Sequence, residues 1–291
     1  MNEKERVVRF APSPTGRLHI GHACSVLFTA AHVKEGGRFL LRIENIDPGR
    51  CRTEFEDGIY EDLAWLGLHW EEPVRRQSEH LDVYRAALAK LDALGVIYPC
   101  FCTRKEIEAE IEAAASAPHG LAQGPDGYLY PGTCRHLNAE ERAAKIAQGA
   151  PYAMRLDVAK AKEVAGKDLH WTDLSAGVQL ATPEIHGDVV IARKDVPASY
   201  HLSVTVDDDL QGVTLVTRGA DLFEATHIHR LLQELLGLAV PDYHHHPLMH
   251  DEEGKRYAKR NNAVTLQHMR EVDGLTPDDI RARVSPFIKV I

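Results

Sequence analysis

Residues 11–22 read APSPTGRLHIGH and separate a short strand pattern, Arg6 to Phe10, from a segment of helical character, Ala23 to Glu35. A loop between a strand and a helix attracts phosphate, because unpaired backbone N–H groups and the positive end of the helix dipole meet there. The order of strand, tight loop and helix also favours βαβ units with a parallel sheet. This stretch therefore predicts both an α/β fold and an anion site.

Three residues of the loop suit a nucleotide phosphate. Gly21 lets a ligand approach the backbone closely. His19 and His22 place two imidazole donors beside the predicted anion site, where they can stabilise charge that develops on phosphate oxygens. An isolated His-x-x-His pair is more often incidental in a loop rich in Pro and Gly, so the prediction depends on the wider sequence.

The βα pattern continues along much of the chain. The further elements that it predicts are a strand at Arg38 to Ile43, a helix opened by a capping box of Thr53 and Glu56, a helix after Ser78, strands at Val189 to Arg193 and Val213 to Arg218, a helix from His227 to Leu236 capped by Thr226, and a last helix after Thr276 with Pro277 at its first position. Strands on both sides of a different middle region predict a sheet split by an insertion.

The composition is that of a globular protein with a sizeable core, since 44% of the 291 residues are hydrophobic and 26% are charged. No apolar run approaches the roughly 20 residues that span a bilayer, and Met1 to Arg9 is unlike a signal peptide, so we expect a cytoplasmic protein. A formal charge of -9 argues against a general nucleic-acid coat but permits local basic patches. Five cysteines are an odd number and too sparse in a chain of this length for a disulfide framework.

The stretch from Arg9 to His22 closely resembles the HIGH-motif region of class I aminoacyl-tRNA synthetases of the glutamyl type. Further stretches resemble motifs of that family in the expected order: RIENID at 42–47, LGLHW at 66–70, VTRGADL at 216–222, and GKRYAKR at 254–260, which aligns with the KMSKS loop. The resemblance implies a Rossmann-like catalytic core with a parallel sheet, and it implies ATP and glutamate as substrates, with Mg2+ accompanying the nucleotide.

With that family, the chain is expected to divide into four segments. Residues 1–98 form the first half of the catalytic domain with its HIGH-type motif, and 99–185 form an inserted zinc-binding and acceptor subdomain. Residues 186–240 form the second half of the catalytic domain, and 241–291 hold the KMSKS-like loop and a short helical segment. We expect no C-terminal anticodon-binding domain.

The resemblance also assigns an amino-acid pocket. Its residues are Arg9, Ala11, Ser13, Glu44, Tyr200 and Arg218. The guanidinium of Arg9 is a planar fork suited to a carboxylate such as the glutamate side chain, and Glu44 is expected to face the α-amino group. Without the motifs, Glu44 and Arg218 read equally well as a surface ion pair, and Tyr200 as a core residue.

Four cations occur within six residues from Lys255 to Arg260, which suits the triphosphate of ATP. We assign ATP binding to Arg256 and Lys259 together with His19, Gly21 and His22, and catalysis to Lys259 and the two histidines. Ala258 departs from the family motif, where a serine hydroxyl could add a hydrogen bond worth about 1 kcal/mol. Asn45 is a second departure, standing where an acidic residue is common.

A structural zinc site is predicted within residues 99–185. The sequence places Cys100 and Cys102 close together and returns Cys134 four residues after Tyr130. Three thiolates and one oxygen donor can complete a tetrahedral zinc site, although His136 competes as the fourth ligand and plain thiols are an equal alternative. The ligand set Cys100, Cys102, Tyr130 and Cys134 rests on resemblance to a truncated branch of the family.

Two other cysteines and a run of histidines have simpler interpretations. Cys24 and Cys51 lie outside that cluster and are expected to be structural. The run of residues 244–246 is three histidines and could form a second metal site, but a polar loop is the safer interpretation.

That truncated branch transfers glutamate to queuosine in the anticodon loop of tRNA(Asp), which the resemblance makes the expected partner of a monomeric enzyme. A truncated enzyme that charges the 3′ end of tRNA is the first alternative. A catalytically silent tRNA-binding paralogue is the second, motivated by Arg256 and Ala258. A nucleotidyltransferase for another small acid is the third, and Arg9, Glu44 and Arg218 argue against it.

Overall fold

The computed structural model describes residues 6–34, 36–115, 123–125, 127–193, 196–249 and 264–288. The strands are β1 (Val7–Phe10), β2 (Arg38–Ile43), β3 (Glu71–Arg76), β4 (Ile97–Cys100), β5 (Gln123–Gly124), β6 (Gly127–Tyr128), β7 (Ala153–Leu156), β8 (His170–Asp173), β9 (Gly177–Leu180), β10 (Val190–Arg193), β11 (Leu215–Gly219) and β12 (Asp242–His246). The α-helices are α1 (Ile20–Ala30), α2 (Thr53–Trp65), α3 (Leu81–Ala93), α4 (Arg104–Ala115), α5 (Ala139–Ala147), α6 (Val158–Ala165), α7 (Tyr200–Leu210), α8 (Ala225–Leu236), α9 (Leu266–Glu271) and α10 (Pro277–Val284).

The predicted parallel sheet is confirmed. Strands β1, β2 and β3 pair in parallel in that order, and β11 pairs in parallel with β12, which pairs in parallel with β8. The N–H of Thr214 donates to the carbonyl of Val7 at 3.0 Å, so β1 lies beside the start of β11. The strand order is therefore β3-β2-β1-β11-β12-β8, and the winding of the chain reverses between β1 and β11.

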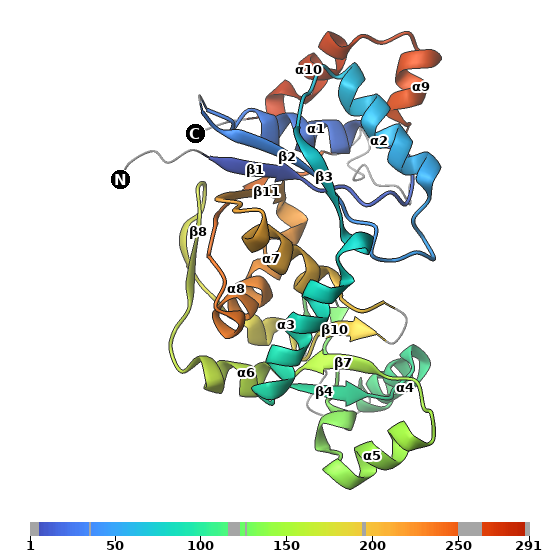
Figure 1. Ribbon diagram of the computed structural model, residues 1–291, viewed down its shortest axis with the longest axis vertical. Coiled ribbons are helices and arrows are strands. Elements are labelled where there is room, and N and C mark those ends of the chain that lie inside the picture. The colour runs from blue at the N-terminus through green and yellow to red at the C-terminus, as the bar shows by residue number, and fades with distance from the viewer. Residues whose placement is uncertain are drawn as a thin grey trace.

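Helices cover both faces of this sheet (Figure 1). Helices α1, α2 and α10 pack on one face around a core that includes Leu41, Leu63 and Ile280. Helices α3, α7 and α8 pack on the other face, where Tyr84 and Leu231 are fully buried. Strands β1 and β2 have apolar residues on both faces, since Val7 and Leu40 belong to one core and Val8 and Leu41 to the other.

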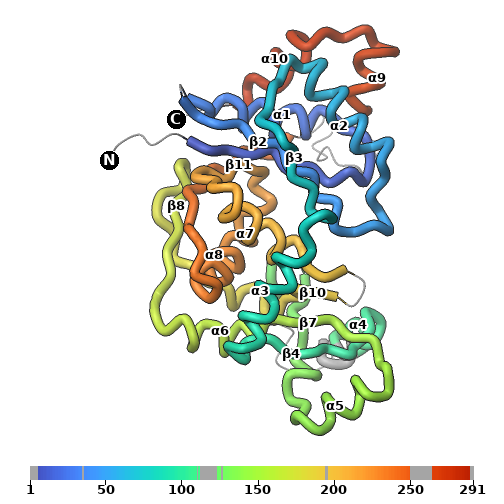
Figure 2. Tube along the Cα trace, viewed as in Figure 1, coloured from blue at the N-terminus to red at the C-terminus, as the bar shows by residue number. Residues whose placement is uncertain are grey.

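A second sheet lies at the far end of the elongated molecule, next to α4 and α5 (Figure 2). Its order is β10-β7-β4 and all of its pairings are antiparallel. The strand expected at Val189 to Arg193 therefore exists as β10 but does not continue the parallel pattern, because a four-residue apolar strand carries no signal for the direction of its partner. Conversely, β8 and β9 fall within residues 99–185 yet join the sheet of β11 and β12. The division into four segments stays a prediction.

Several helix starts differ from the expected ones. Thr53 is the first residue of α2 rather than its cap, because the N–H of Arg52 is held by the carbonyl of Pro14 and Arg52 becomes the N-cap without a side-chain bond. Similarly, Thr226 lies inside α8, which follows Glu224 as N-cap. Helix α1 begins earlier than Ala23, because a histidine caps it.

Two further starts were tested by the structure. Ser78 lies in a 3₁₀ turn, Gln77–Glu79, and α3 begins after His80. The last helix is confirmed in full: Thr276 caps α10 in a capping box with Asp279, and Pro277 occupies the first helical position. Within the described ranges, none of the helices is both long and apolar enough to cross a membrane.

Candidate functional site

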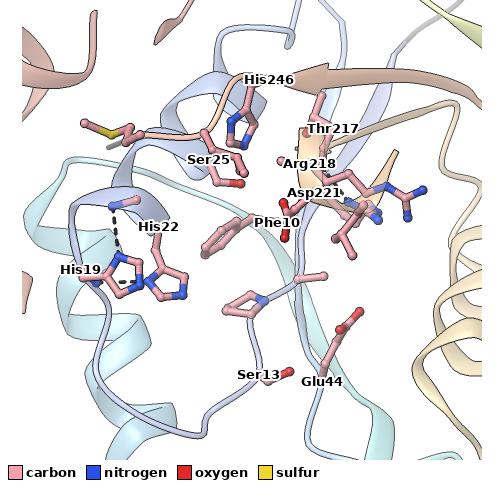
Figure 3. A pocket seen from close by; sticks show the side chains of 18 of the residues that line it. Phe10, Ser13, His19, His22, Ser25, Glu44, Thr217, Arg218, Asp221 and His246 are labelled. Atoms are coloured by element: carbon pink, nitrogen blue, oxygen red, sulfur yellow. Dashed lines mark hydrogen bonds between the residues drawn. The ribbon is translucent and has the colours of Figure 1, made fainter. Parts of the chain in front are cut away.

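A cavity of about 390 Å³ opens at the carboxyl ends of β1 and β11, the point where the winding of the sheet reverses. Open α/β sheets bind ligands at such a point, because the helices on either side diverge there. The predicted glutamate-binding and ATP-binding residues in the described chain all line this cavity: Arg9, Ala11, Ser13, His19, Gly21, His22, Glu44, Tyr200 and Arg218. Figure 3 shows His19 and His22 on one side of it and Glu44 and Arg218 on the other.

His19 and His22 form the N-terminal cap of α1. Nδ1 of His19 accepts the N–H of Gly21 and Nδ1 of His22 accepts the N–H of His19, each at 3.1 Å. Backbone N–H groups can only donate, so each Nδ1 is bare and each neutral ring carries its proton on Nε2. The capping box therefore fixes both rings in the form that presents an Nε2–H donor, beside the positive end of the helix dipole.

Glu44 follows β2 and is held at the floor of the cavity. Its backbone N–H donates to the carbonyl of Pro12 at 3.1 Å, and its carboxylate accepts from Nη2 of Arg42 at 3.2 Å. Burial raises the pKa of Glu44, while the neighbouring guanidinium groups of Arg42 and Arg9 oppose that rise. The carboxylate is thus a hydrogen-bond acceptor with one cationic partner on the protein side.

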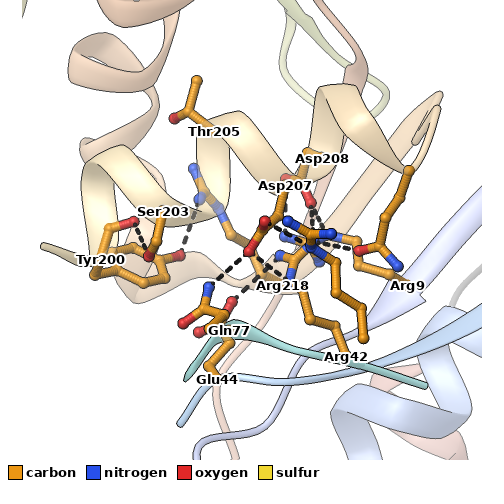
Figure 4. Close-up of polar contacts among 12 residues, drawn as sticks. Arg9, Arg42, Glu44, Gln77, Tyr200, Ser203, Thr205, Asp207, Asp208 and Arg218 are labelled. Atoms are coloured by element: carbon orange, nitrogen blue, oxygen red, sulfur yellow. Dashed lines mark hydrogen bonds and ion pairs between the residues drawn. The ribbon is translucent and has the colours of Figure 1, made fainter. Parts of the chain in front are cut away.

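Arg9 and Arg42 converge on Asp208 of α7 (Figure 4). Nε of Arg9 lies 2.9 Å from Oδ1 of Asp208 and Nη1 of Arg42 lies 2.8 Å from the same oxygen. Burial would raise the pKa of Asp208, but the two guanidinium groups hold it below its ordinary value. Nε and Nη2 of Arg9 donate to Asp208 and Nη1 donates to the carbonyl of Thr217 at 3.2 Å, so only the remaining hydrogen on each Nη can face a ligand.

Asp207 anchors the other side of this network. It accepts hydrogen bonds from the phenol of Tyr84, from Nε of Arg75 and from Nε2 of Gln77, at 2.8 to 3.0 Å. Sequence reasoning missed Arg42, Asp207 and Asp208. A signal was present, because the acidic run at 207–209 interrupts an otherwise apolar helical pattern.

Arg218, at the end of β11, is buried and surrounded by neutral acceptors. The acceptors are Nε2 of His245 at 3.0 Å, Nδ1 of His229 at 3.1 Å, the phenol of Tyr200 at 3.2 Å and the hydroxyl of Thr226 at 2.6 Å. Burial raises the pKa of Tyr200, which stays a neutral phenol. Sequence reasoning gave no role to His229, and it considered His245 only within the histidine run, as a possible metal ligand or part of a polar loop.

A second cavity of about 280 Å³ adjoins the first and shares Ser13, Glu44 and Tyr200 with it. Its other walls come from the loop after β2, with Asp47 and Cys51, and from the start of α7. A molecule in this cavity would meet the first cavity on the side away from His19 and His22, which do not line it.

The predicted metal ligands lie together. The Sγ atoms of Cys100, Cys102 and Cys134 fall within 4.8 Å of one another, and the phenol oxygen of Tyr130 lies 3.3 Å from Sγ of Cys100 and 3.4 Å from Sγ of Cys102. His136 is not part of this group. These four side chains could hold a metal ion, because tetrahedral zinc with thiolates at about 2.3 Å requires sulfur atoms a little under 4 Å apart.

The histidine run at 244–246 is not the polar loop that the sequence favoured. The three residues form the end of β12 and are buried, since the strand packs between β11 and β8. His244 contacts His32 and Ser175, and His245 contacts Asp173. Among the described residues, the group that could hold a metal ion is the cysteine cluster of Cys100, Cys102 and Cys134.

Cys24 is buried in the α1 core, and burial raises its pKa to about 11, which fits the structural role expected for it. Arg256 and Lys259 lie outside the described residues. Thr265, the second described residue after them, forms a bridge with His19, and the N–H of Leu266 donates to the carbonyl of Leu18 at 2.8 Å. The chain thus returns to the phosphate-side loop immediately before α9.

Comparison with known proteins gives consistent relatives. Residues 5–284 match the family described as tRNA synthetases class I (E and Q), catalytic domain. Over 280 residues the chain is 45% identical to the glutamyl-Q tRNA(Asp) synthetase of Rhodobacter capsulatus, which covers 94% of this chain and 98% of that protein. It is 40% identical over 271 residues to the glutamate--tRNA ligase of Aquifex aeolicus, covering 93% of this chain but 54% of the ligase.

A solved structure agrees with these matches. The crystal structure of the glutamate-tRNA synthetase from Elizabethkingia anophelis superposes with a TM-score of 0.72 at 27% identity, over 89% of this chain and 53% of that one. The chain therefore spans about half the length of this synthetase and of the Aquifex ligase, and nearly all of the Rhodobacter protein.

Proposed function

The chain belongs to the class I tRNA synthetases for glutamate and glutamine, in the group of the glutamyl-Q tRNA(Asp) synthetases, and from that premise we propose that it activates glutamate with ATP and transfers it to queuosine in the anticodon loop of tRNA(Asp). The observation that carries the choice of acceptor is the 45% identity over 98% of the Rhodobacter protein. A cytoplasmic location is part of the proposal.

The glutamate would bind between Arg9, Glu44, Tyr200 and Arg218. Three arginines at this end, Arg9, Arg42 and Arg75, form ion pairs with Glu44, Asp207 and Asp208, whereas Arg218 hydrogen-bonds to neutral groups and Asp221 also lines the cavity. Arg218 is therefore a cation that a carboxylate of glutamate could pair with. Arg218 and Arg9 would bind the side-chain carboxylate, and Glu44 would bind the ammonium group. Ala11 and Ser13 would form the walls beside the bound glutamate.

In the first step an α-carboxylate oxygen attacks the α-phosphorus of ATP, the bond to the bridging oxygen breaks, and pyrophosphate leaves. The Nε2–H groups of His19 and His22 would bind the phosphate oxygens as their charge increases, and Gly21, which has no side chain, would let them approach the backbone closely. Lys259 and Arg256 are assigned to the same phosphates by sequence, and Mg2+ would accompany them.

In the second step a hydroxyl of the modified base attacks the carbonyl carbon of the adenylate, and AMP leaves with the electron pair of the anhydride bond. No general base is assigned. The second cavity supports an approach from the side opposite to His19 and His22, since it meets the first at Ser13, Glu44 and Tyr200.

We further propose that the cysteine cluster holds one structural Zn2+, with Cys100, Cys102, Cys134 and Tyr130 as ligands. Bound metal would tie β4 to the turn that carries Cys134 and so order the insertion next to β7. Burial raises the pKa of Cys102 to about 12, so binding must release protons from the thiols. One zinc per chain by atomic emission, lost in a Cys102→Ser and Cys134→Ser double variant, is the expected result.

The function is tested in two stages with one preparation. Glutamate-dependent ATP–pyrophosphate exchange without tRNA measures activation, and labelled glutamate is then offered with tRNA that contains or lacks queuosine, before and after removal of the 3′-terminal adenosine. Exchange together with queuosine-dependent label on tRNA that lacks the terminal adenosine is expected. Labelling only of tRNA with an intact 3′ end would favour a charging enzyme, and tRNA binding without exchange would favour a silent paralogue.

A further inference from the structure

Arg218 differs from the other arginines of the cavity in its partners. Arg9 and Arg42 each contact the carboxylate of Asp208. Within the described chain Arg218 makes no ion pair, although it is only 5% exposed, and its hydrogen bonds go to two imidazoles and two hydroxyls. A buried cation without a carboxylate is costly, so an anionic group brought to it would gain a strong partner.

The hydrogen positions around Arg218 follow from its chemistry, because a guanidinium group can only donate. Nε2 of His245 receives the Nε–H of Arg218, so the proton of a neutral His245 ring is on Nδ1, which lies 2.8 Å from Oδ2 of Asp173. His229 must be the opposite tautomer, with a bare Nδ1 toward Arg218 and an Nε2–H toward Nδ1 of His201 at 3.2 Å. Each ring has one tautomer that supports Arg218.

Both rings are also held in the neutral state. Burial, together with the nearby charge of Arg218, lowers the pKa of His245 to about 4. The hydrogen bond that the ring donates to Asp173 opposes this shift but does not outweigh it. Burial and Arg218 lower the pKa of His229 well below its ordinary value. Two neutral rings can orient the guanidinium group without cancelling its charge.

The topology of the sheet brings the three residues into line. Arg218 and His245 are register partners in the parallel pair of β11 and β12, and β8 ends at Asp173 on the other side of β12. Asp173 also accepts the backbone N–H of His245 at 3.1 Å, and Ser175 and Ala176 donate to its second oxygen. The carboxylate is therefore fixed by backbone groups before it orients the ring.

We propose that Asp173 and His245 are positioning residues for amino-acid selection: they aim the guanidinium group of Arg218 into the cavity and leave its charge for a side-chain carboxylate, so that an acid is chosen over its amide. This inference rests on the proposed function, in which Arg218 binds the glutamate side chain. Neither residue is expected to touch the substrate.

The test measures KM for glutamate, KM for ATP and the preference for glutamate over glutamine in pyrophosphate exchange. His245→Phe keeps a ring but removes the acceptor of the Arg218 hydrogen bond. We expect the glutamate KM to rise about tenfold or more, because the loss of a hydrogen bond to a charged group changes an equilibrium constant by about that factor. The preference for glutamate should fall with it, while the ATP KM stays within about twofold. His245→Gln, whose amide oxygen can accept from Arg218, should recover most of the loss.

Asp173→Asn tests the tautomer directly. Nitrogen NMR of the His245 ring should place the proton on Nδ1 in the wild type and shift it toward Nε2 in the variant, with a smaller rise in the glutamate KM. His244→Phe is the matched control, since His244 is a buried neighbour on the same strand that contacts His32 and Ser175 instead of Arg218. It should leave the glutamate KM unchanged.

Four results would overturn the inference. Equal increases in glutamate KM for His245→Phe and His244→Phe, or a parallel increase in ATP KM, would mean that His245 only stabilises the fold. If His245→Phe does not fold, an unchanged tautomer and unchanged KM in Asp173→Asn would have the same meaning. Absence of glutamate-dependent exchange in the wild type would overturn the proposed function as well, which separates the two failures.

Discussion

The two ends of the main cavity are built from different kinds of groups. The glutamate end is a network of buried ion pairs in which Arg9, Arg42 and Asp208 satisfy one another before any ligand arrives. The phosphate end consists, among the described residues, of the positive end of the α1 dipole and the Nε2–H donors of His19 and His22, whose Nδ1 atoms accept backbone N–H groups. Fixed charges suit a substrate whose charge stays constant, whereas neutral donors gain strength as charge develops on phosphate oxygens.

The largest effect is expected at the centre of the glutamate end. Arg42 is 0% exposed and contacts Asp208, Glu44 and Gln211, so Arg42→Met leaves two buried carboxylates without that partner. Breaking a buried ion pair in this way costs about 3 to 5 kcal/mol. We expect a loss of that size in the free energy of unfolding, measured by urea denaturation.

Arg50→Met is the matched control, because Arg50 pairs with Asp47 but is largely exposed. Exposed pairs contribute less than about 1 kcal/mol. Equal losses in the two variants would mean that the network at the glutamate end is not the preformed structure described above.

The next largest effect is expected at the phosphate end, in rate rather than stability. His22→Ala removes an Nε2–H donor, and loss of one donor to a developing negative charge costs about 100-fold or more in kcat. We expect that decrease in pyrophosphate exchange, with the glutamate KM nearly unchanged.

His22→Asn separates catalysis from capping. Its amide oxygen can still accept the N–H of His19, so the helix cap, worth about 1 kcal/mol, should survive while the Nε2 donor does not. A variant with wild-type rate would show that His22 serves α1 alone.

A smaller effect is expected for Glu44→Gln, which keeps the shape of the side chain but removes the charge proposed to bind the α-ammonium group. Hydrogen bonds to charged groups contribute about 1.5 to 3 kcal/mol, so the KM for glutamate should rise roughly tenfold to a hundredfold. The ATP KM should not follow. A rise in both constants would mean that Glu44 supports the whole cavity through Arg42.

The phosphate end was the part most readable from sequence. A continuous stretch, residues 11–22, follows directly on β1 and contains the loop, the helix cap and both histidines, and local signals suffice where one segment builds a site. The start of α1 was still predicted late, because histidine is not among the usual capping residues.

The glutamate end could be read only in part. Motif resemblance pointed to Arg9, Glu44 and Arg218, but their partners come from distant segments: Asp208 lies 199 residues after Arg9, and His245 lies 27 after Arg218. Such contacts depend on strand order and register, which no short pattern specifies. The acidic run in α7 and the histidine run in β12 were both visible, yet only the fold gives them partners.

The smallest predicted effect concerns Asp62 of α2, on the sheet face that also carries α1. Asp62 is fully buried, neither of its oxygens has a hydrogen-bond partner in the described chain, and Nη1 of Arg270 is 3.6 Å away. Burial raises the pKa of Asp62 to about 6, with Arg270 and Arg17 lowering it and Glu61 and Glu271 raising it. Asp62 is thus an acid whose charge is poorly compensated, unlike Asp208 at the glutamate end.

The sign of the pH effect follows from that raised pKa. The folded state holds the proton of Asp62 more tightly than the unfolded state, whose pKa is about 3.9, so its stabilising contribution is full at low pH and is lost as the pH rises toward about 6. Asp62→Asn should abolish this loss and raise the free energy of unfolding above that pH by about 1 to 2 kcal/mol, after allowance for the nearby arginines. Glu61→Gln, on the same helix but half-exposed, should change little. Identical pH slopes in wild type and Asp62→Asn would mean that Arg270 and Arg17 already compensate the carboxylate, as Arg9 and Arg42 compensate Asp208 at the glutamate end.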